Sequence, residues 1–187
     1  MKGESIGDTT NPRRIAGGDA NLPPMTAHNE ARVAILMGSK NDWEKMKPAA
    51  DVLEKLGVVS DVRVISAHRT PARHHDYVTG AEDRGIEIFI CGAGMAAHLA
   101  GVTAALTALP VLGVPLDGSA VDGLDALMAT VQMPGGIPVA TFAIGKAGAK
   151  NAGLFAGAIL AGRDESVRKA LAEFRAAQTA GVPETPF

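Results

Sequence analysis

Short apolar runs alternate with helical patterns over most of this chain. The first run, RVAILM at Arg32–Met37, stops at Gly38, and the other strand candidates are Asp61–Ile65, Ile86–Cys91, Val111–Val114 and Val139–Ile144. Helices are predicted at Asp42–Leu56, Pro71–Arg84, Ala96–Ala108, Gly123–Val131, Lys146–Ala161 and Glu165–Ala180. Strands that alternate with helices form a parallel sheet with right-handed crossovers and helices on both faces. The sequence therefore predicts an α/β fold with five parallel strands.

Composition excludes several classes of protein. Two uncharged stretches, Ile88–Leu116 and Ala126–Gly145, exceed the ~20 residues of a membrane span, but glycine and proline interrupt both, which favours buried strands and turns. The balance of 18 Lys+Arg against 20 Asp+Glu in 187 residues predicts no basic face for nucleic acid or membrane lipid. The single cysteine, Cys91, excludes an intrachain disulfide and a cysteine-clustered zinc site, and a cytoplasmic location is expected.

Three segments are predicted along the chain. Residues 1–30 are polar and aperiodic and are expected to form a mobile tail. Residues 31–162 contain the alternating pattern and are expected to form one folded domain. Residues 163–187 add a charged helix and a short tail, which are candidates for a contact with a neighbouring subunit.

The loop after the first strand, GSKND, has two interpretations, one as part of a ligand site and one as a helix cap. Ligands of open α/β sheets bind beyond the carboxyl ends of the strands, and backbone N–H groups at a helix start favour an anion. In this reading Ser39 contacts a phosphate and Asp42 suits a sugar hydroxyl. In the other reading, Ser39 caps the helix and Asp42, three residues on, completes a capping box.

The loop after the second strand, SAHRTP, is the most informative. Thr70 and Pro71 are typical of a helix start, which leaves His68 and Arg69 between a strand and a helix. Imidazole serves as a general acid or base near neutral pH, and guanidinium binds phosphate or carboxylate. The alternative is an ordinary surface loop with two solvated polar residues.

The loop after the third strand contains a match to the dinucleotide-binding fingerprint. Gly92, Gly94 and Ala97 have the required spacing, and Asp117 lies 20 residues beyond Ala97. The match falls in the third strand–helix unit, so small residues that let helix and strand approach closely are the favoured explanation. His74 and His75 are adjacent and point apart on a helix, so they are predicted to be solvated and not to bind a metal.

Five motifs together resemble a known family. They are GSKND (38–42), SAHRTP (66–71), GAGMAAHLAG (92–101), LPVLGVP (109–115) and VQMPGGIPVATFAIGKAGAKNA (131–152). In this order and spacing they are similar to the catalytic subunit family of phosphoribosylaminoimidazole carboxylase, bacterial type, whose members are N5-carboxyaminoimidazole ribonucleotide mutases of purine biosynthesis. The resemblance implies a three-layer αβα sandwich of flavodoxin-like fold, a homo-octamer, a ribonucleotide substrate, and neither metal nor organic cofactor. A further candidate partner is the ATP-dependent synthetase that forms the carbamate.

The resemblance also implies residue roles. His68 is expected to protonate the carbamate nitrogen, which releases carbon dioxide, and then to remove the C4 proton after recarboxylation. Ser39 and Arg69 are expected to hold the 5′-phosphate, and Asp42 the ribose hydroxyls. The Gly92–Gly94 segment is expected to approach the imidazole ring, and His98 receives a supporting role only.

The chain departs from the family pattern at three positions. Asn41 stands where serine is usual, Met95 where glycine is usual and Ala100 where proline is usual. A sister class of carboxylases uses free carbon dioxide. It tends to carry lysine where this chain has Arg69, and it lacks the sequence around Pro71. The mutase is therefore favoured over a direct carboxylase. A nucleotide-cofactor protein and a non-catalytic scaffold are the alternatives from other classes.

Overall fold

The computed structural model describes residues 30–186. The tail predicted at residues 1–30 lies outside this range, except for its last residue. The elements follow in the order β1 (Val33–Met37), η1 (Lys40–Asp42), α1 (Trp43–Lys55), β2 (Ser60–Val64), α2 (Pro71–Thr79), η2 (Glu82–Arg84), β3 (Ile88–Gly94), α3 (Leu99–Ala104), β4 (Val111–Leu116), α4 (Leu124–Val131), β5 (Ala140–Thr141), α5 (Lys146–Ala161) and α6 (Glu165–Ala180). Both C-terminal helices have the bounds that the sequence predicts.

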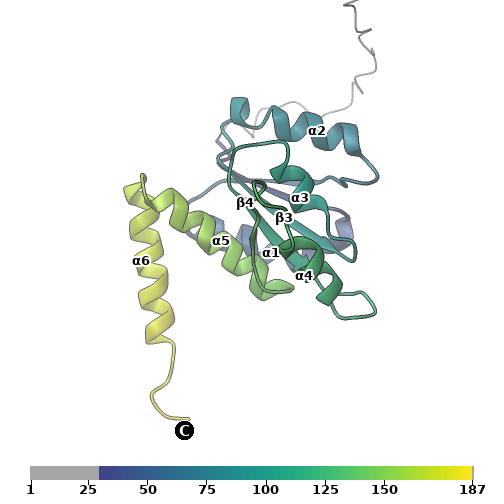
Figure 1. The fold of residues 1–187 in the computed structure, drawn as a ribbon. Helices are drawn as coiled ribbons and strands as arrows, with labels where there is room; N and C mark the ends of the chain where they lie inside the picture. Colours follow the sequence, from purple (N-terminus) through teal and green to yellow (C-terminus); the bar gives the residue numbers. More distant parts are fainter. Residues whose placement is uncertain (1–29, 187) are drawn as a thin grey trace, which may run out of the picture.

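The five strands form one parallel sheet in the order β2-β1-β3-β4-β5. This order confirms the predicted α/β fold (Figure 1). The chain moves from β1 outward to β2 and then returns to the other side of β1 with β3, so strand order reverses between β1 and β3. Open α/β sheets bind their ligands beyond the carboxyl ends of the strands at such a reversal. The loops after β1, β2 and β3 are therefore the expected place for a site.

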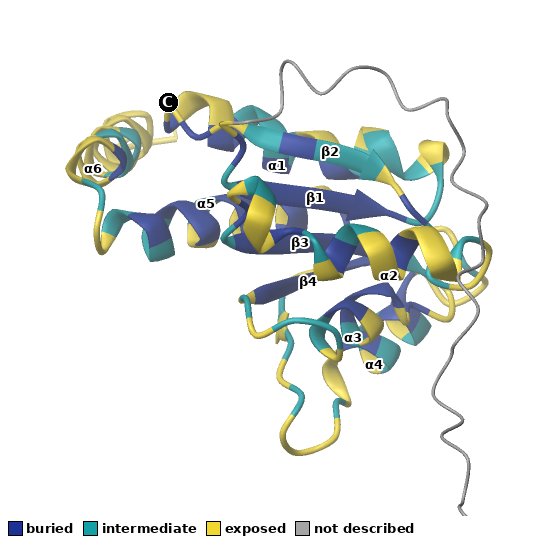
Figure 2. Cartoon of the chain, turned by 90° about the horizontal axis from the view of Figure 1, so that it is seen from above, coloured by how far each residue is buried: buried dark blue, intermediate teal, exposed yellow. Residues whose placement is uncertain are grey.

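Two apolar cores lie on opposite faces of the sheet. The side chains of a strand point to the two faces of the sheet in turn, so alternate residues of β1 belong to different cores. Val33, Ile35 and Met37 belong to one core, and Ala34 and Leu36 belong to the other. The first core packs under α1 and α5, and the second packs under α2 and α3. Figure 2 shows β1, β3 and β4 as buried strands between these layers.

Glycines of α5 let this helix approach α1 closely. A Cβ atom at Gly153 would lie 2.5 Å from Cγ1 of Val52 and 2.9 Å from the carbonyl oxygen of Ala49. A Cβ atom at Gly157 would lie 2.4 Å from Cδ1 of Leu56. The contact between α1 and α5 fixes α1, whose start carries the first candidate loop.

The helix predicted at Ala96–Ala108 is wrong in its bounds. The chain forms short turns first, with the N–H of Ala97 bonded to the carbonyl of Met95, and α3 spans only Leu99–Ala104. The left-handed backbone of Met95, with a φ of +57°, interrupts the helical path just before this segment, so α3 begins later than predicted.

Two further elements are also shorter than predicted. The strand predicted at Val139–Ile144 pairs only over Ala140–Thr141, because it is an edge strand with β4 as its one neighbour. The helix predicted at Pro71–Arg84 ends at Thr79, where Gly80 follows, and η2 continues separately. Within residues 30–186, no helix is both long enough and apolar enough to span a membrane.

Candidate active site

The loop after β1 is folded by a capping box. Oγ of Ser39 accepts a hydrogen bond from the N–H of Asn41 at 3.3 Å, and the N–H of Ser39 donates to Oδ2 of Asp42 at 3.0 Å. The capping reading of this loop is therefore confirmed. A hydroxyl that accepts one bond still has its proton to donate, and a carboxylate has a second oxygen. The capping bonds thus orient both side chains and leave each with capacity for a ligand.

Arg69 joins the loop after β2 to the loop after β1. Its Nη2 donates to the carbonyl oxygen of Gly38 at 2.5 Å, and its Nε lies 3.4 Å from Oγ of Ser66. Strands β1 and β2 are neighbours, so their loops share one edge of the sheet. The guanidinium therefore lies beside Ser39 and Asp42, as expected for residues of one site.

His68 contacts the loop after β3 through a second histidine. Nε2 of His68 lies 2.9 Å from Nδ1 of His98, and the two rings meet edge to face with centroids 4.9 Å apart. Both side chains are exposed. One ring nitrogen must donate and the other accept, so the contact holds a proton between the rings. Sequence reasoning gave His98 a supporting role, whereas the structure places it in direct contact with His68. Its position just beyond the glycine segment of β3 was the available signal.

Gly92 and Gly94 do not form a dinucleotide-binding loop. Gly92 and Gly94 lie within β3, and α3 begins only at Leu99, so the glycines do not open a helix. A Cβ atom at Gly92 would lie 2.3 Å from Sδ of Met46, and one at Gly94 would lie 3.2 Å from the carbonyl oxygen of Leu116. Close packing therefore explains both glycines, as the favoured reading of this segment expects.

His74 is not solvated, and that prediction is wrong. Its side chain is 1% exposed, and its Nε2 lies 2.8 Å from Oγ1 of Thr103 on α3. Adjacent helix residues point about 100° apart, so one histidine faces α3 while His75 faces solvent. Cys91 is buried, and burial raises the pKa of its thiol to about 12.

With this geometry in place, comparison with known proteins decides the family. The family model described as AIR carboxylase matches residues 32–181. This chain belongs to the AIR carboxylase family. The match covers every strand and helix described above, and it confirms the resemblance carried by the five motifs.

Relatives in this family are close in sequence. A protein of Brucella melitensis named N5-carboxyaminoimidazole ribonucleotide mutase is 54% identical over 154 residues, which cover 82% of this chain and 95% of the relative. A protein of the same name from Pseudomonas aeruginosa is 52% identical over 156 residues, 83% of this chain and 96% of the relative. The crystal structure of Treponema denticola PurE superposes with a TM-score of 0.71 at 25% identity, over 79% of this chain and 91% of that chain. The predicted three-layer, flavodoxin-like fold is thereby confirmed.

Met95 has a left-handed backbone conformation. Its φ is +57°, a left-handed conformation in which a side chain costs about 1–2 kcal/mol. The side chain is 65% exposed and lies between the glycine segment and His98. The chain thus bears an exposed apolar side chain beside the candidate site.

Charge within the candidate site is mixed. Burial is the largest influence on Asp42 and raises the pKa of its carboxyl group, while the N–H of Ser39 and the cations Lys45 and Arg69 partly oppose this rise. Among residues 30–186, no group of three or more His, Cys, Asp or Glu side chains is placed to hold a metal ion. Ser39, Asp42, Arg69, His68 and His98 together provide hydroxyl, carboxylate, guanidinium and imidazole groups at one sheet edge.

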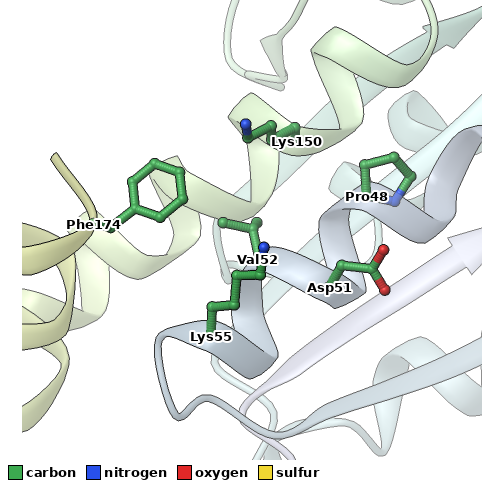
Figure 3. Close-up of a pocket in the computed structure, with 6 residues that line it drawn as sticks. All are labelled: Pro48, Asp51, Val52, Lys55, Lys150 and Phe174. Atoms are coloured by element: carbon green, nitrogen blue, oxygen red, sulfur yellow. The ribbon is translucent and has the colours of Figure 1, made fainter. Parts of the chain in front are cut away.

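A cavity of about 210 Å³ lies away from these loops (Figure 3). It is open to solvent and lies between α1, α5 and α6, and its lining includes Lys55, Lys150 and Phe174. Nζ of Lys150 lies 5.5 Å from the centre of the Phe174 ring, which helps to hold α6 against α5. No group expected to act in the reaction lines this cavity, so it belongs to the packing of α6.

Proposed function

We propose that this chain is an N5-carboxyaminoimidazole ribonucleotide mutase of purine biosynthesis and that His68 is its general acid and base. The relatives at 52–54% identity bear this name. The observation that carries the residue assignment is the contact of 2.9 Å between His68 and His98 at the strand-order reversal, beside Arg69 and the capping box of the first loop.

In the proposed reaction one histidine moves a proton twice. The protonated ring of His68 gives a proton to the exocyclic carbamate nitrogen, the bond from this nitrogen to the carboxylate carbon breaks, and carbon dioxide leaves. The π electron pair of the C4–C5 bond, pushed by the freed amino group, then forms a bond from C4 to the carbon of carbon dioxide, and the ring carries the positive charge until C4 loses its proton. The neutral ring of His68 removes the C4 proton and regains its starting state. The reaction is an isomerisation, so no proton, electron or co-reactant is consumed.

The contact with His98 supports this double role. A general acid that later acts as a base needs a fixed ring orientation and a nitrogen that readily gains and loses a proton. A second imidazole at hydrogen-bond distance supplies both, because it fixes the ring and shares the proton. In this proposal His98 orients His68 and does not itself touch the reacting atoms.

The binding roles follow from the chemistry of the remaining groups. Arg69 is proposed to hold the 5′-phosphate because its planar guanidinium matches an oxyanion, and Ser39 is proposed to donate its hydroxyl proton to the same group. Asp42 is proposed to accept hydrogen bonds from the ribose hydroxyls. A carboxylate repels a phosphate, so the sugar hydroxyls are the proposed partners of Asp42. The Gly92–Gly94 segment is proposed to approach the imidazole ring with its backbone.

Several organisational features are part of the same proposal. They are the boundaries 1–30, 31–162 and 163–187, a homo-octamer, a cytoplasmic location, and transient contact with the ATP-dependent synthetase that forms the carbamate. Support comes from the family relation and, for the last segment, from the projecting position of α6 against α5 (Figure 1).

A paired assay tests the proposed reaction. One arm supplies freshly generated N5-carboxyaminoimidazole ribonucleotide, and the other supplies aminoimidazole ribonucleotide with bicarbonate, both without ATP or added metal. Rapid formation of 4-carboxy-5-aminoimidazole ribonucleotide in the first arm alone is the expected result. Efficient turnover in the second arm at modest bicarbonate concentration would identify a direct carboxylase instead. Inactivity of well-folded protein in both arms would favour a non-catalytic scaffold.

A further inference from the structure

A buried hydrogen-bond network connects α2 and α3 beneath the candidate site. His74 of α2, Thr103 of α3 and Cys91 of β3 are each 1% exposed or less. The Oγ1 atom of Thr103 lies 2.8 Å from Nε2 of His74, 2.8 Å from the carbonyl oxygen of Leu99 and 3.6 Å from Sγ of Cys91. Polar groups that are buried this deeply contribute to stability only when they are hydrogen-bonded.

The proton positions in this network follow from its chemistry. A carbonyl oxygen can only accept, so the single hydroxyl proton of Thr103 is donated to Leu99. The hydroxyl oxygen must then accept from its other partners. His74 therefore carries a proton on Nε2 and donates it to Thr103, and the thiol of Cys91 donates weakly to the same oxygen. Thr103 is fully satisfied in this arrangement.

Each end of the network is tied to a loop of the candidate site. On α2, the N–H of His74 donates to the carbonyl of Thr70, and Oγ1 of Thr70 donates to the carbonyl of Ser66, in the loop that carries His68. On α3, the carbonyl that accepts from Thr103 belongs to Leu99, the residue that follows His98. The pair formed by His74 and Thr103 thus joins the two loops from below, and the pair formed by His68 and His98 joins them at the surface.

We propose that His74 is a positioning residue, which holds α2 against α3 and so keeps His68 within hydrogen-bond reach of His98. This inference rests on the proposed function, in which His68 is the general acid and base. His74 lies in the buried layer and acts on the reaction only through the position of the His68 loop. The exposed contact between the two rings has little support of its own, because water competes for both rings.

The surroundings of His74 keep its ring neutral. Burial lowers the pKa of His74, with a smaller contribution from the neighbouring His75. On the elements packed against it, α3 carries no charged residue, and the titratable group on β3 is the thiol of Cys91. A neutral ring with its proton on Nε2 is therefore the state that supports the contact at neutral pH.

Four substitutions test the role of His74. His74→Leu removes the donor and leaves Thr103 its bond to Leu99, and His74→Met serves the same purpose with a more flexible side chain if the leucine variant does not fold. His74→Gln keeps an N–H donor near the position of Nε2. His75→Asn on the exposed side of α2 is the matched control. Circular dichroism and urea unfolding establish that each variant is folded.

Two readouts separate positioning from a general structural effect. The first uses the 15N chemical shifts of the His68 ring in the free protein, which report the proton on each ring nitrogen. We expect the shifts to move toward those of a free imidazole in His74→Leu and to stay near wild type in His74→Gln and His75→Asn. The second readout is kinetic. We expect kcat of His74→Leu to fall between about 10- and 100-fold, as for a small misplacement of a catalytic group, with KM little changed because Arg69 has its own bonds to Gly38 and Ser66.

The outcomes distinguish this inference from the proposed function. Unchanged 15N shifts of His68 in folded His74→Leu would overturn the positioning role, and so would a fall in kcat that His74→Gln does not restore. Absence of mutase turnover in the wild-type protein would overturn the proposed function, while the 15N shifts would still decide whether His74 positions His68.

Discussion

Nζ of Lys45 lies 2.8 Å from the backbone oxygen of Asp117 and 2.9 Å from its Oδ1. Lys45 is in the first turn of α1, after β1, and Asp117 follows β4, although β3 lies between these two strands in the sheet. The contact therefore spans the carboxyl end of β3. Together with Arg69 on Gly38 and His68 on His98, it links the loops after four strands into one edge. Such an edge can hold a ligand whose groups are recognised by residues far apart in the chain.

Arg69→Lys is expected to weaken binding of the ribonucleotide. A lysine keeps the charge but loses the planar fork and the reach to the carbonyl of Gly38. We expect KM to rise roughly 10- to 100-fold, the equivalent of one charge-assisted hydrogen bond, with a smaller change in kcat. Steady-state kinetics measure both. Arg73→Lys, at an exposed position of α2, is the control, and equal KM values for both variants would contradict the phosphate assignment.

Asp42→Asn is expected to weaken substrate binding without lowering the stability of the fold. Burial raises the pKa of Asp42, so the ionised carboxylate is less favourable in the folded chain than in the unfolded chain above that pKa. Asparagine is neutral and keeps an acceptor for the N–H of Ser39. We therefore expect urea unfolding at pH 7 to show equal or higher stability for Asp42→Asn, a difference that disappears near pH 3, and a raised KM. Clear destabilisation at pH 7 would contradict this account of Asp42.

Met95→Gly is expected to be more stable than Met95→Ala. Both variants lose the exposed side chain, but only alanine keeps the Cβ atom that is unfavourable at a φ of +57°. The greater freedom of glycine in the unfolded chain offsets part of this gain. We expect a difference of up to about 1 kcal/mol in the free energy of unfolding, measured with urea. An alanine variant as stable as the glycine variant would show that the backbone at Met95 relaxes.

Asp164→Ala is expected to lower stability at neutral pH and less so in acid. Asp164 caps α6: hydrogen bonds from Ser166 and the N–H of Val167, with Arg32 close by, lower its pKa to about 2. A lowered pKa in the folded state means that the stabilisation is present above the unfolded pKa near 4 and is lost as the pH falls from about 4 to 2.

The measurement for Asp164 is thermal unfolding of the wild type and Asp164→Ala across this pH range. The gap in Tm between them should shrink as the pH falls. Glu173→Ala removes an exposed carboxylate of α6 that lies 4.0 Å from Lys169 and is the control. A gap in Tm that is constant from pH 7 to pH 2 would contradict the cap's dependence on charge.

Much of the fold was predictable because local signals agree with tertiary packing. The run RVAILM at Arg32–Met37, stopped by Gly38, predicts β1 almost to the residue because a strand buried on both faces is apolar throughout. α6 begins at its predicted residue because Asp164 is a typical helix cap. The polar residues of the candidate site were predictable for a similar reason, since they directly follow strands.

What sequence reasoning did not predict depends on contacts between distant segments. The burial of His74 is decided by α3, which lies 29 positions along the chain at Thr103. The direct contact between His68 and His98 likewise depends on where the turns around Met95 place His98, just before α3 begins. The sequence pattern of residues 96–108 is helical throughout, and it does not indicate the left-handed backbone at Met95 or the late start of α3.

The central claim is that His68 moves the proton in the mutase reaction, and the turnover of His68→Asn tests it most directly. Asparagine removes the titratable ring at an exposed position, so the fold is expected to persist. With N5-carboxyaminoimidazole ribonucleotide as substrate, we expect kcat to fall about 100- to 10,000-fold, with His75→Asn as the control at wild-type activity. Wild-type turnover in folded His68→Asn would contradict the assignment.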